Sequence, residues 1–370
     1  MMFILYRWIL LTIIAIILLV KRRMKMIRFN CDYSEGCHPL ILEALNNTNN
    51  EQTIGYGCDH YCKEACELIK KECGHEDIDV HFLVGGTQTN LTVIDSALRS
   101  YQGIVAADSA HINVHEPGTI EACGHKILTI PNTNGKICAE DVEKLCLEHL
   151  NNPAFEHTTQ PKMVFISFST ELGSIYCKDE LTKLYNICKK YNLYLYIDGA
   201  RLGYGLTSDD SDLTLKDICD LCDVFYIGGT KVGALFGEAV VIKNNDLKTD
   251  FRYFIKQKGG MLAKGRLLGI QFKVLFTNNL YFEISKHAND MANYLRNELE
   301  SLNFEFITPN KTNQIFIKMN DNLINKINDY FALEIEDKLD DNYHMVRICT
   351  SWATKIEDCH KLINFIRNNI

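Results

Sequence analysis

Short runs of β-branched and aromatic residues alternate with amphipathic stretches along most of this 370-residue chain. The amphipathic stretches, such as 90–100 and 178–192, have the periodicity of helices covering a core. Continuous apolar strands separated by helices are typical of a sheet with both faces covered, so the pattern predicts an α/β fold with a mostly parallel sheet. The predicted strands are VHFLV (80–84), GIVAAD (103–108), KILTI (126–130), KMVFISF (162–168), LYLYID (193–198), DVFYIG (223–228) and EAVVI (238–242).

The pattern changes near Gly259 and Gly260. A long helical stretch over roughly 265–302 comes next, and 313–319 and 343–352 then alternate like strands. A chain of this length also exceeds one ordinary hydrophobic core. We therefore predict a large domain over 26–260 and a smaller C-terminal α+β domain over 261–370.

The net charge of −8 argues against a nucleic-acid-binding protein, which would present a basic face. Hydrophobic residues make up 46% of the chain and charged residues 23%, which is typical of globular proteins. We therefore expect no nucleic-acid partner.

The segment FILYRWILLTIIAIILLV (3–20) is almost entirely apolar, and Lys21, Arg22 and Arg23 follow it. Its length just reaches that of a transmembrane helix, and the basic cluster favours a cytoplasmic position for the remainder. Two interpretations stay open: residues 1–25 anchor the protein to a membrane, or translation starts at Met24 or Met26. Both predict a cytoplasmic globular part.

The chain has 15 cysteines, but their spacing does not indicate a metal site. Cys58, Cys62 and Cys66 would lie on one helix, with the outer pair about 12 Å apart along its axis. Cys219 and Cys222 form a CxxC pair without a second pair. We expect reduced thiols and no bound metal.

Polar residues follow four of the predicted strands. In FLVGGTQTNLTV (82–93) a strand leads into Gly85 and Gly86 at a helix start, where free N–H groups favour an anion. The stretch lacks the third glycine of a dinucleotide site and the GK[ST] of a P-loop. Taken alone, an ordinary capped helix start explains it equally well.

The other three strand ends carry Asp198, Lys231 and His111. Asp198 could simply pair with Arg201, Lys231 could lie on an exposed turn, and His111 could bond nearby backbone. Ligands of open α/β sheets, however, bind beyond the carboxyl ends of the strands. Pyridoxal phosphate requires four groups at one edge of a sheet: a phosphate site, a carboxylate, a lysine and an imidazole. We therefore predict this cofactor and a small-molecule amino-acid substrate.

From about Phe29 onward the chain resembles the aromatic amino acid β-eliminating lyase/threonine aldolase family. The resemblance is carried by DYSEGCHP (32–39), GGTQTNLT (85–92), HINVHE (111–116), DGARLGYG (198–205) and GGTKVGALFGEA (228–239). It implies an aspartate-aminotransferase-like fold, a large sheet domain with a smaller C-terminal domain, and pyridoxal phosphate.

The resemblance also implies roles for individual residues. Lys231 would bond the cofactor aldehyde, Asp198 would contact the pyridine nitrogen, and His111 would stack on the ring and take part in proton transfer. Arg201 would contribute to the cofactor site and, with Arg347, hold the substrate carboxylate. The remaining predicted site residues are Gly86, Thr87 and Gln88 for the phosphate, and Glu116 and Cys31 near the substrate.

Three positions depart from the family pattern. Cys31 and Asp32 replace a serine–aspartate pair, Glu171 in TELG (170–173) replaces a histidine, and Leu262 replaces an arginine. Glu171 is predicted to be catalytic, because a buried glutamate with a raised pKa can act as a base. These departures leave the cofactor residues intact but open the choice of reaction.

The resemblance therefore predicts a lyase that cleaves a β-hydroxy L-amino acid to glycine and an aldehyde. The alternatives are β-elimination or transamination on the same cofactor, or a catalytically silent homologue tethered to a membrane. The segment TIGYGCD (53–59) matches a family segment that reaches a neighbouring active site, which implies a homodimer or homotetramer.

Overall fold

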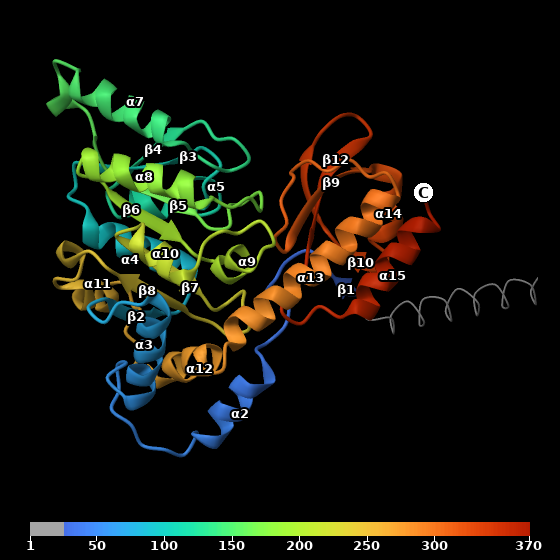
Figure 1. Cartoon of the computed structure of the whole chain (residues 1–370), viewed down its shortest axis with the longest axis horizontal. Helices are drawn as coiled ribbons and strands as arrows, with labels where there is room; N and C mark the ends of the chain where they lie inside the picture. The colour runs from blue at the N-terminus through green and yellow to red at the C-terminus, as the bar shows by residue number, and fades with distance from the viewer. Residues whose placement is uncertain (1–25) are drawn as a thin grey trace, which may run out of the picture.

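The computed structural model describes residues 26–370, and its central feature is a seven-stranded sheet (Figure 1). All seven strands predicted for this part of the chain are present. Their order is β2-β8-β7-β6-β5-β3-β4. The strands are β2 (Asp79–Leu83), β3 (Gln102–Ala107), β4 (Lys126–Ile130), β5 (Gln160–Ser167), β6 (Tyr194–Asp198), β7 (Val224–Gly228) and β8 (Glu238–Ile242).

Strand β8 runs antiparallel to both of its neighbours, β2 and β7, whereas the pairs from β7 to β4 are parallel. The first residue of β8 therefore lies at the same edge of the sheet as the last residues of β6 and β7. This reversal brings a residue at a strand start to the edge where ligands of α/β proteins bind.

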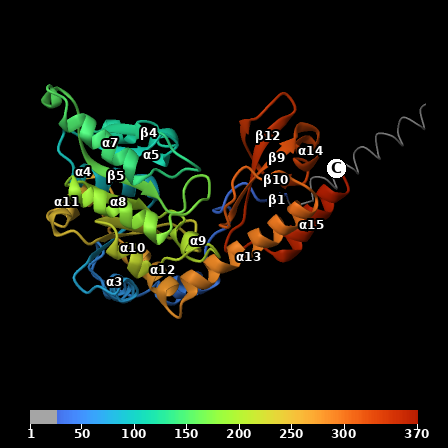
Figure 2. The ribbon, with the colours of Figure 1, turned by 45° about the horizontal axis from the view of Figure 1, so that its top comes forward.

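Helices cover both faces of the sheet (Figures 1 and 2). On one face α4 packs with α11 and α6, and on the other α3 packs with α12 and α10, and α7 with α8. The bounds are α3 (His60–Cys73), α4 (Gly86–Ala97), α5 (His111–Val114), α6 (Thr119–Ala122), α7 (Ala139–Leu150), α8 (Lys178–Lys190), α9 (Leu202–Leu206), α10 (Leu215–Asp220), α11 (Phe251–Gln257) and α12 (Arg266–Phe276).

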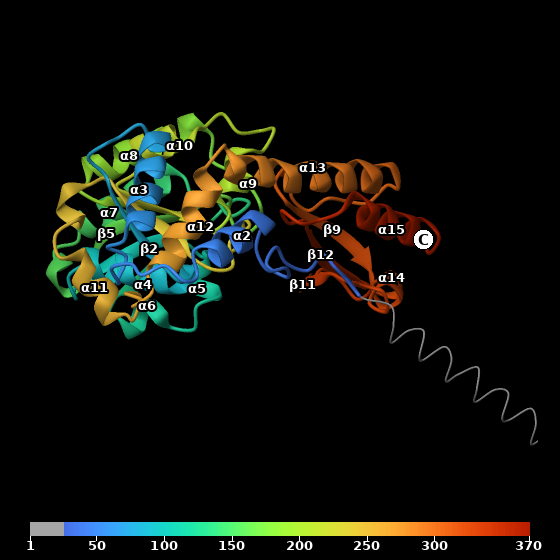
Figure 3. The same ribbon diagram turned by 90° about the horizontal axis from the view of Figure 1, so that it is seen from below.

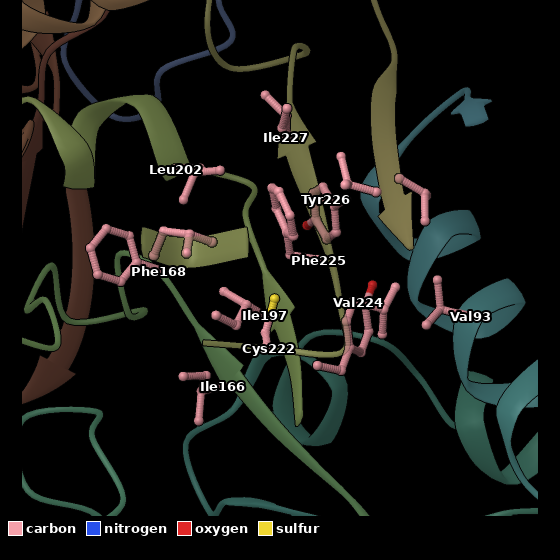
Figure 4. Close-up of a cluster of buried hydrophobic side chains, with 14 of the residues drawn as sticks. Val93, Ile166, Phe168, Ile197, Leu202, Cys222, Val224, Phe225, Tyr226 and Ile227 are labelled. Atoms are coloured by element: carbon pink, nitrogen blue, oxygen red, sulfur yellow. The ribbon is translucent and has the colours of Figure 1, made fainter. Parts of the chain in front are cut away.

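The core of the large lobe lies between the sheet and these helices (Figure 4). Ile166, Ile197 and Phe225 come from three successive strands, β5, β6 and β7, and are at most 3% exposed. Val93 of α4 is 1% exposed and belongs to the same cluster. Side chains buried on both sides of the sheet explain why these strands read as continuous apolar runs rather than as alternating ones.

A second, smaller sheet has the order β11-β12-β9 (Figure 3). A separate hydrophobic cluster packs against it. Phe29 belongs to this cluster, because β1 (Ile27–Arg28) pairs in parallel with β10 (Phe331–Ala332). The chain thus enters the small lobe first and reaches the large lobe through α2 (Pro39–Asn47). The other elements here are β9 (Gln314–Asn320), α14 (Asp321–Ile327), β11 (Glu334–Lys338), β12 (Tyr343–Cys349) and α15 (Ile356–Arg367). The division at residue 260 stays a prediction.

The stretch over 265–302 consists of two helices, α12 and α13 (Leu280–Ser301), rather than one. They are separated by Asn278 and Asn279, whose φ values of 53° and 65° lie in the left-handed region. Asparagine adopts the left-handed conformation more readily than most residues. This backbone conformation cannot continue an α-helix, so α12 ends before α13 begins. Helix α13 then runs from the large lobe to the small one (Figure 1).

Two predictions concern other parts of the sequence. The proposed membrane segment 3–20 lies outside the described residues; among residues 26–370, no helix is long and apolar enough to cross a bilayer. The expected cysteine helix begins only at His60, so Cys58 precedes α3 while Cys62 and Cys66 lie on it.

Candidate active site

A cavity of about 340 Å³ opens at the carboxyl edge of the large sheet. It gathers residues that follow five different strands: Gly86 after β2, His111 after β3, Glu171 after β5, Arg201 after β6 and Lys231 after β7. The complete lining is Tyr33, Val84, Gly85, Gly86, Thr87, Asn90, His111, Ser167, Ser169, Glu171, Asp198, Ala200, Arg201, Tyr226, Thr230, Lys231, Phe236 and Glu238. Seven of the predicted site residues are therefore brought together: Gly86, Thr87, His111, Glu171, Asp198, Arg201 and Lys231.

The N-terminus of α4 forms one end of this cavity. Gly85 is the N-cap residue and supplies no side-chain hydrogen bond to the helix. The N–H groups of a first helical turn have no partner within the helix, so those of Gly86 and Thr87 are available to an anion. The Gln88 side chain instead stabilises the turn before α4 with two hydrogen bonds. Its Oε1 accepts from Val84 N at 3.1 Å, and its Nε2 donates to the Lys258 carbonyl at 3.0 Å.

Asp198 is 4% exposed and is held by three donors. Its Oδ1 accepts from the Tyr226 hydroxyl at 2.5 Å and from Ala200 N at 3.0 Å, while Oδ2 accepts from Asn90 Nδ2 at 3.0 Å. These three hydrogen bonds fix the orientation of the carboxyl group at the cavity. This arrangement fits the protonated ring nitrogen of pyridoxal phosphate.

The turn that carries Asp198 packs tightly against the neighbouring strand. A Cβ atom at Gly199 would lie 1.7 Å from the Tyr226 carbonyl oxygen, and one at Gly228 would lie 2.5 Å from the Ala200 carbonyl oxygen. Both positions exclude any side chain. Glycine here allows β6 and β7 to bring Asp198 and the Lys231 loop to the same cavity.

Asn90 also links Asp198 to His111. Its Nδ2 atom donates to Glu116 Oε1 at 2.8 Å, and the same oxygen lies 2.9 Å from His111 Nδ1. Glu116 is 2% exposed and lies behind His111 rather than in the cavity. Although burial lowers it, the pKa of His111 is raised overall by the hydrogen bond to Glu116 and by the charge of Asp198.

Lys231 lies on the loop between β7 and β8, next to Thr230. Its carbonyl oxygen accepts from the Tyr204 hydroxyl at 2.5 Å. Burial and the positive charge of Arg201 lower the pKa of the Lys231 amine, against the opposing carboxylates. A lowered pKa makes a larger fraction of the amine available as a nucleophile.

Glu171, predicted to stand at the position of a family histidine, follows β5. Its Oε1 accepts from the Ser167 hydroxyl at 2.7 Å and from the backbone N–H of His111 at 3.0 Å. Burial raises the pKa of this carboxyl, and the charge of Asp198 adds to the increase against those two hydrogen bonds.

Four predicted residues do not line the cavity: Gln88, Glu116, Cys31 and Arg347. Arg347 on β12 pairs with Glu336 at 3.2 Å and donates to the Asn30 carbonyl at 3.2 Å. Cys31 Sγ lies 3.2 Å from Ser34 Oγ. The roles predicted for these residues stay predictions.

Asn90, Tyr226 and Glu238 also line the cavity, and none of them belongs to the predicted site. In the sequence Asn90 lies in a helical pattern and Tyr226 in an apolar run, and neither context indicates a site. For Glu238 a signal was available, because a charged residue begins the otherwise apolar run EAVVI.

Comparisons with known proteins identify the family of the chain. Residues 38–322 match the β-eliminating lyase family. The low specificity L-threonine aldolase of Pseudomonas sp. is 29% identical over 300 residues, covering 80% of this chain and 84% of that protein. The corresponding Pseudomonas aeruginosa protein is 26% identical and covers 92% and 97%.

Solved structures agree as well. The Leishmania major threonine aldolase is 43% identical with a TM-score of 0.90, covering 92% of this chain and 99% of that one. Thermus thermophilus aspartate aminotransferase, at 12% identity, a TM-score of 0.70 and coverage of 96% and 94%, shows the shared fold. The predicted aspartate-aminotransferase-like fold is thereby confirmed, and so is the cofactor, because enzymes of this family use pyridoxal phosphate. The chain belongs to the β-eliminating lyase family.

Proposed function

We propose that this protein cleaves the Cα–Cβ bond of a β-hydroxy L-amino acid, giving glycine and an aldehyde. The observation that carries the proposal is that Lys231, Asp198 and the free N-terminus of α4 line one cavity. The similarity to threonine aldolases from Leishmania and Pseudomonas supports this choice of reaction.

The residues of the cavity divide into those that hold the cofactor and those that act on the substrate. Lys231 would bond the cofactor aldehyde, Asp198 would pair with the ring nitrogen, and the first turn of α4 would bind the phosphate. When bound, pyridoxal phosphate supplies a cationic ring that stabilises the electron pair released from the broken bond. Tyr226 and Asn90 keep the Asp198 carboxyl fixed in position for this purpose.

Arg201 is proposed to bind the substrate α-carboxylate, because guanidinium groups pair well with carboxylates. Asp32 holds the guanidinium through Nε and Nη2, which leaves Nη1 to contact the substrate. Arg347 would assist from β12 once its pairing with Glu336 is exchanged for the substrate, and Cys31 would lie near the same end.

Glu171 is proposed to take the proton of the substrate β-hydroxyl. Its Oε1 is bonded by Ser167 and by the His111 N–H, so Oε2 is the atom that would accept this proton. Its raised pKa makes the carboxylate a stronger base than an ordinary glutamate. His111, oriented by Glu116 through Nδ1, would cover the cofactor ring and exchange protons through Nε2.

A product assay tests the proposal. Purified protein with pyridoxal phosphate is incubated with a panel of β-hydroxy L-amino acids, and glycine, aldehyde, ammonia and keto acid are all quantified. Equal amounts of glycine and aldehyde are expected. Ammonia with keto acid would instead establish β-elimination, which Glu171 in place of histidine keeps open; amino-group transfer to a keto acid would establish transamination. No turnover of any substrate would contradict an enzymatic role.

A homodimer or homotetramer is proposed as the functional form. Ile54 and Tyr56, in the segment that resembles a subunit-bridging segment, are 72% and 49% exposed, and Tyr253 is 76% exposed. Large apolar side chains exposed together favour contact with a second copy. Light scattering after size-exclusion chromatography should give at least twice the mass of the chain.

A cytoplasmic location is proposed as well. Fractionation of cells that express either the full chain or a version starting at Met26 would test this location. The comparison of the two versions would show the contribution of residues 1–25.

A further inference from the structure

Glu238 is a carboxylic acid buried in the cofactor cavity, and the mechanism above does not use it. It begins β8, is 3% exposed and lines the cavity together with Thr230 and Lys231. Its Oε2 accepts from Gly229 N at 3.0 Å, and its Oε1 lies 2.7 Å from the Thr230 hydroxyl. Glu238 therefore contacts the two residues that precede Lys231.

The Thr230 hydroxyl can be arranged in two ways around this carboxyl. Its oxygen already accepts from Gly237 N at 3.0 Å. When Glu238 is ionised, the hydroxyl must donate to Oε1. When Glu238 is protonated on Oε1, the carboxyl donates instead, because a hydroxyl oxygen can accept two hydrogen bonds. The Thr230 proton is then free for a second acceptor in the cavity.

We propose that Glu238 is the proton-holding group of the cofactor site: it is protonated while the phosphate-bearing cofactor is bound, and so turns the Thr230 hydroxyl into a donor for that anion. A phosphate ester carries nearly two negative charges near neutral pH, so a neutral carboxyl is favoured beside it. This inference rests on the assignment of the cavity as the cofactor site.

The surroundings of Glu238 favour its neutral form even before the cofactor binds. Burial and the charge of Asp198 raise the pKa of Glu238 to about 8, against hydrogen bonds from Thr230 and Gly229 and the charge of Lys231. His81 lies on the same face of β2, paired with Val240, and burial lowers its pKa to about 4, so it adds no charge near neutrality. Three phenols among the described residues also interact electrostatically with Glu238 and have raised pKa values: Tyr196 of β6, Tyr226 of β7 and Tyr281 of α13.

The sign of the expected pH dependence follows from linkage. Below about pH 8 Glu238 is already protonated, so binding requires no proton. Above it, Glu238 must take up a proton, and cofactor affinity falls as the pH rises by up to about tenfold per pH unit. Glu238→Gln has the same shape and a permanent donor, so it should remove this contribution.

The experiment measures the dissociation constant of pyridoxamine 5′-phosphate for the full chain between pH 6.5 and 9.5. This probe has the ring and the phosphate but no aldehyde, so bond formation with Lys231 does not contribute. Because the ionisation of the probe and of Lys231 is common to both proteins, the ratio of wild-type to Glu238→Gln constants isolates Glu238. The ratio should be near 1 at pH 7 and about 10 at pH 9. Glu143→Gln, on the surface of α7, is the matched control and should follow the wild type.

A second measurement does not depend on the variant. Calorimetry of probe binding at pH 8.5, in two buffers that differ in ionisation enthalpy, measures the number of protons taken up. The wild-type protein should take up more protons than Glu238→Gln. If the variant does not fold, the wild-type uptake at pH 8.5 is compared with its uptake at pH 6.5, which should be smaller. A ratio of dissociation constants that is independent of pH, or no excess uptake, would overturn the role of Glu238 while leaving the cofactor site intact. Failure of the probe to bind at all would overturn the cofactor site itself.

Discussion

Asp32 binds Arg201 with both of its carboxylate oxygens: Arg201 Nε donates to Oδ2 at 2.8 Å and Nη2 donates to Oδ1 at 3.1 Å. Asn313 Nδ2 adds a third hydrogen bond to Oδ2 at 2.9 Å, and Asp32 is completely buried. Burial raises the pKa of Asp32, but Arg201 and Lys231 lower it overall. The guanidinium proposed to bind the substrate is therefore fixed in position before the substrate arrives.

Asp32→Asn should weaken substrate binding more than catalysis. An amide in place of the carboxylate cannot accept both guanidinium bonds and leaves the Arg201 charge uncompensated. We expect KM to rise about tenfold with a smaller change in kcat, and the free energy of unfolding to fall by about 3 kcal/mol. Steady-state kinetics and urea denaturation measure these effects. Asp358→Asn, which breaks only a surface pair with Lys361, should change stability by less than about 1 kcal/mol.

Asn90→Ala should weaken cofactor binding. Asn90 donates to both Asp198 and Glu116 and accepts from the Tyr196 hydroxyl at 2.7 Å, so its removal leaves three buried polar groups short of a partner. Each such group costs about 1–3 kcal/mol, and we expect at least a tenfold loss of pyridoxal phosphate affinity in equilibrium dialysis. Asn293→Ala, which removes contacts with Asp209 and Arg296 and none in the cavity, is the control. Unchanged affinity in Asn90→Ala would show that the network does not position Asp198.

Glu171 should control the acid side of the pH–rate profile. A base must be ionised to act, so kcat should rise with pH through the raised pKa of Glu171, above the range of an ordinary glutamate. Glu171→Gln should reduce kcat by about 10²–10³-fold and abolish this limb. Glu171→His restores the residue type of the family pattern and should recover part of the rate. Full activity of Glu171→Gln would assign the base to another group.

The stability of the cofactor-free protein should also depend on Glu238. The pKa of Glu238 is about 8 in the folded protein, above the ordinary value of 4.5, so the folded state binds more protons between these values. This contribution to stability is complete below about pH 4.5 and is lost as the pH rises to about 8, by at most about 1.4 kcal/mol per pH unit. Urea unfolding at pH 5.5, 7 and 8.5 should show the wild type losing stability relative to Glu238→Gln. If the difference in the free energy of unfolding between the two proteins did not vary with pH, the pKa of Glu238 would not be raised in the folded protein.

Lys231 should be the residue that bonds the cofactor. Borohydride reduction of the protein with pyridoxal phosphate, followed by peptide mapping, should place the label on Lys231. Lys231→Ala should lose both the label and the visible absorbance of the lysine-bound cofactor, whereas Lys286→Ala, which removes a surface pair with Asp290, should retain them. A label elsewhere would contradict the assignment, and no label would favour a catalytically silent homologue.

The sequence by itself determined the sheet and most of the cavity. Apolar runs over 193–198 and 223–228 predicted β6 and β7 because both faces of a parallel sheet are buried. Residues after such strands meet at one edge, so Asp198, Lys231 and His111 could be placed together without a structure.

The tertiary structure decided what depends on strand direction and on contacts between distant segments. EAVVI reads as one more buried strand, and in a parallel strand Glu238 would lie at the edge opposite the cavity. Antiparallel pairing with β2 and β7 reverses this and puts Glu238 beside Thr230. Similarly, the hydrogen bond between Asp32 and Arg201 joins residues 169 positions apart, and the one between Asn90 and Asp198 joins residues 108 positions apart. No local periodicity in the sequence encodes such contacts. The physical reason is that apolar patterning specifies which faces are buried, whereas the pairing of buried polar groups is fixed only when the packed chain brings donors and acceptors together.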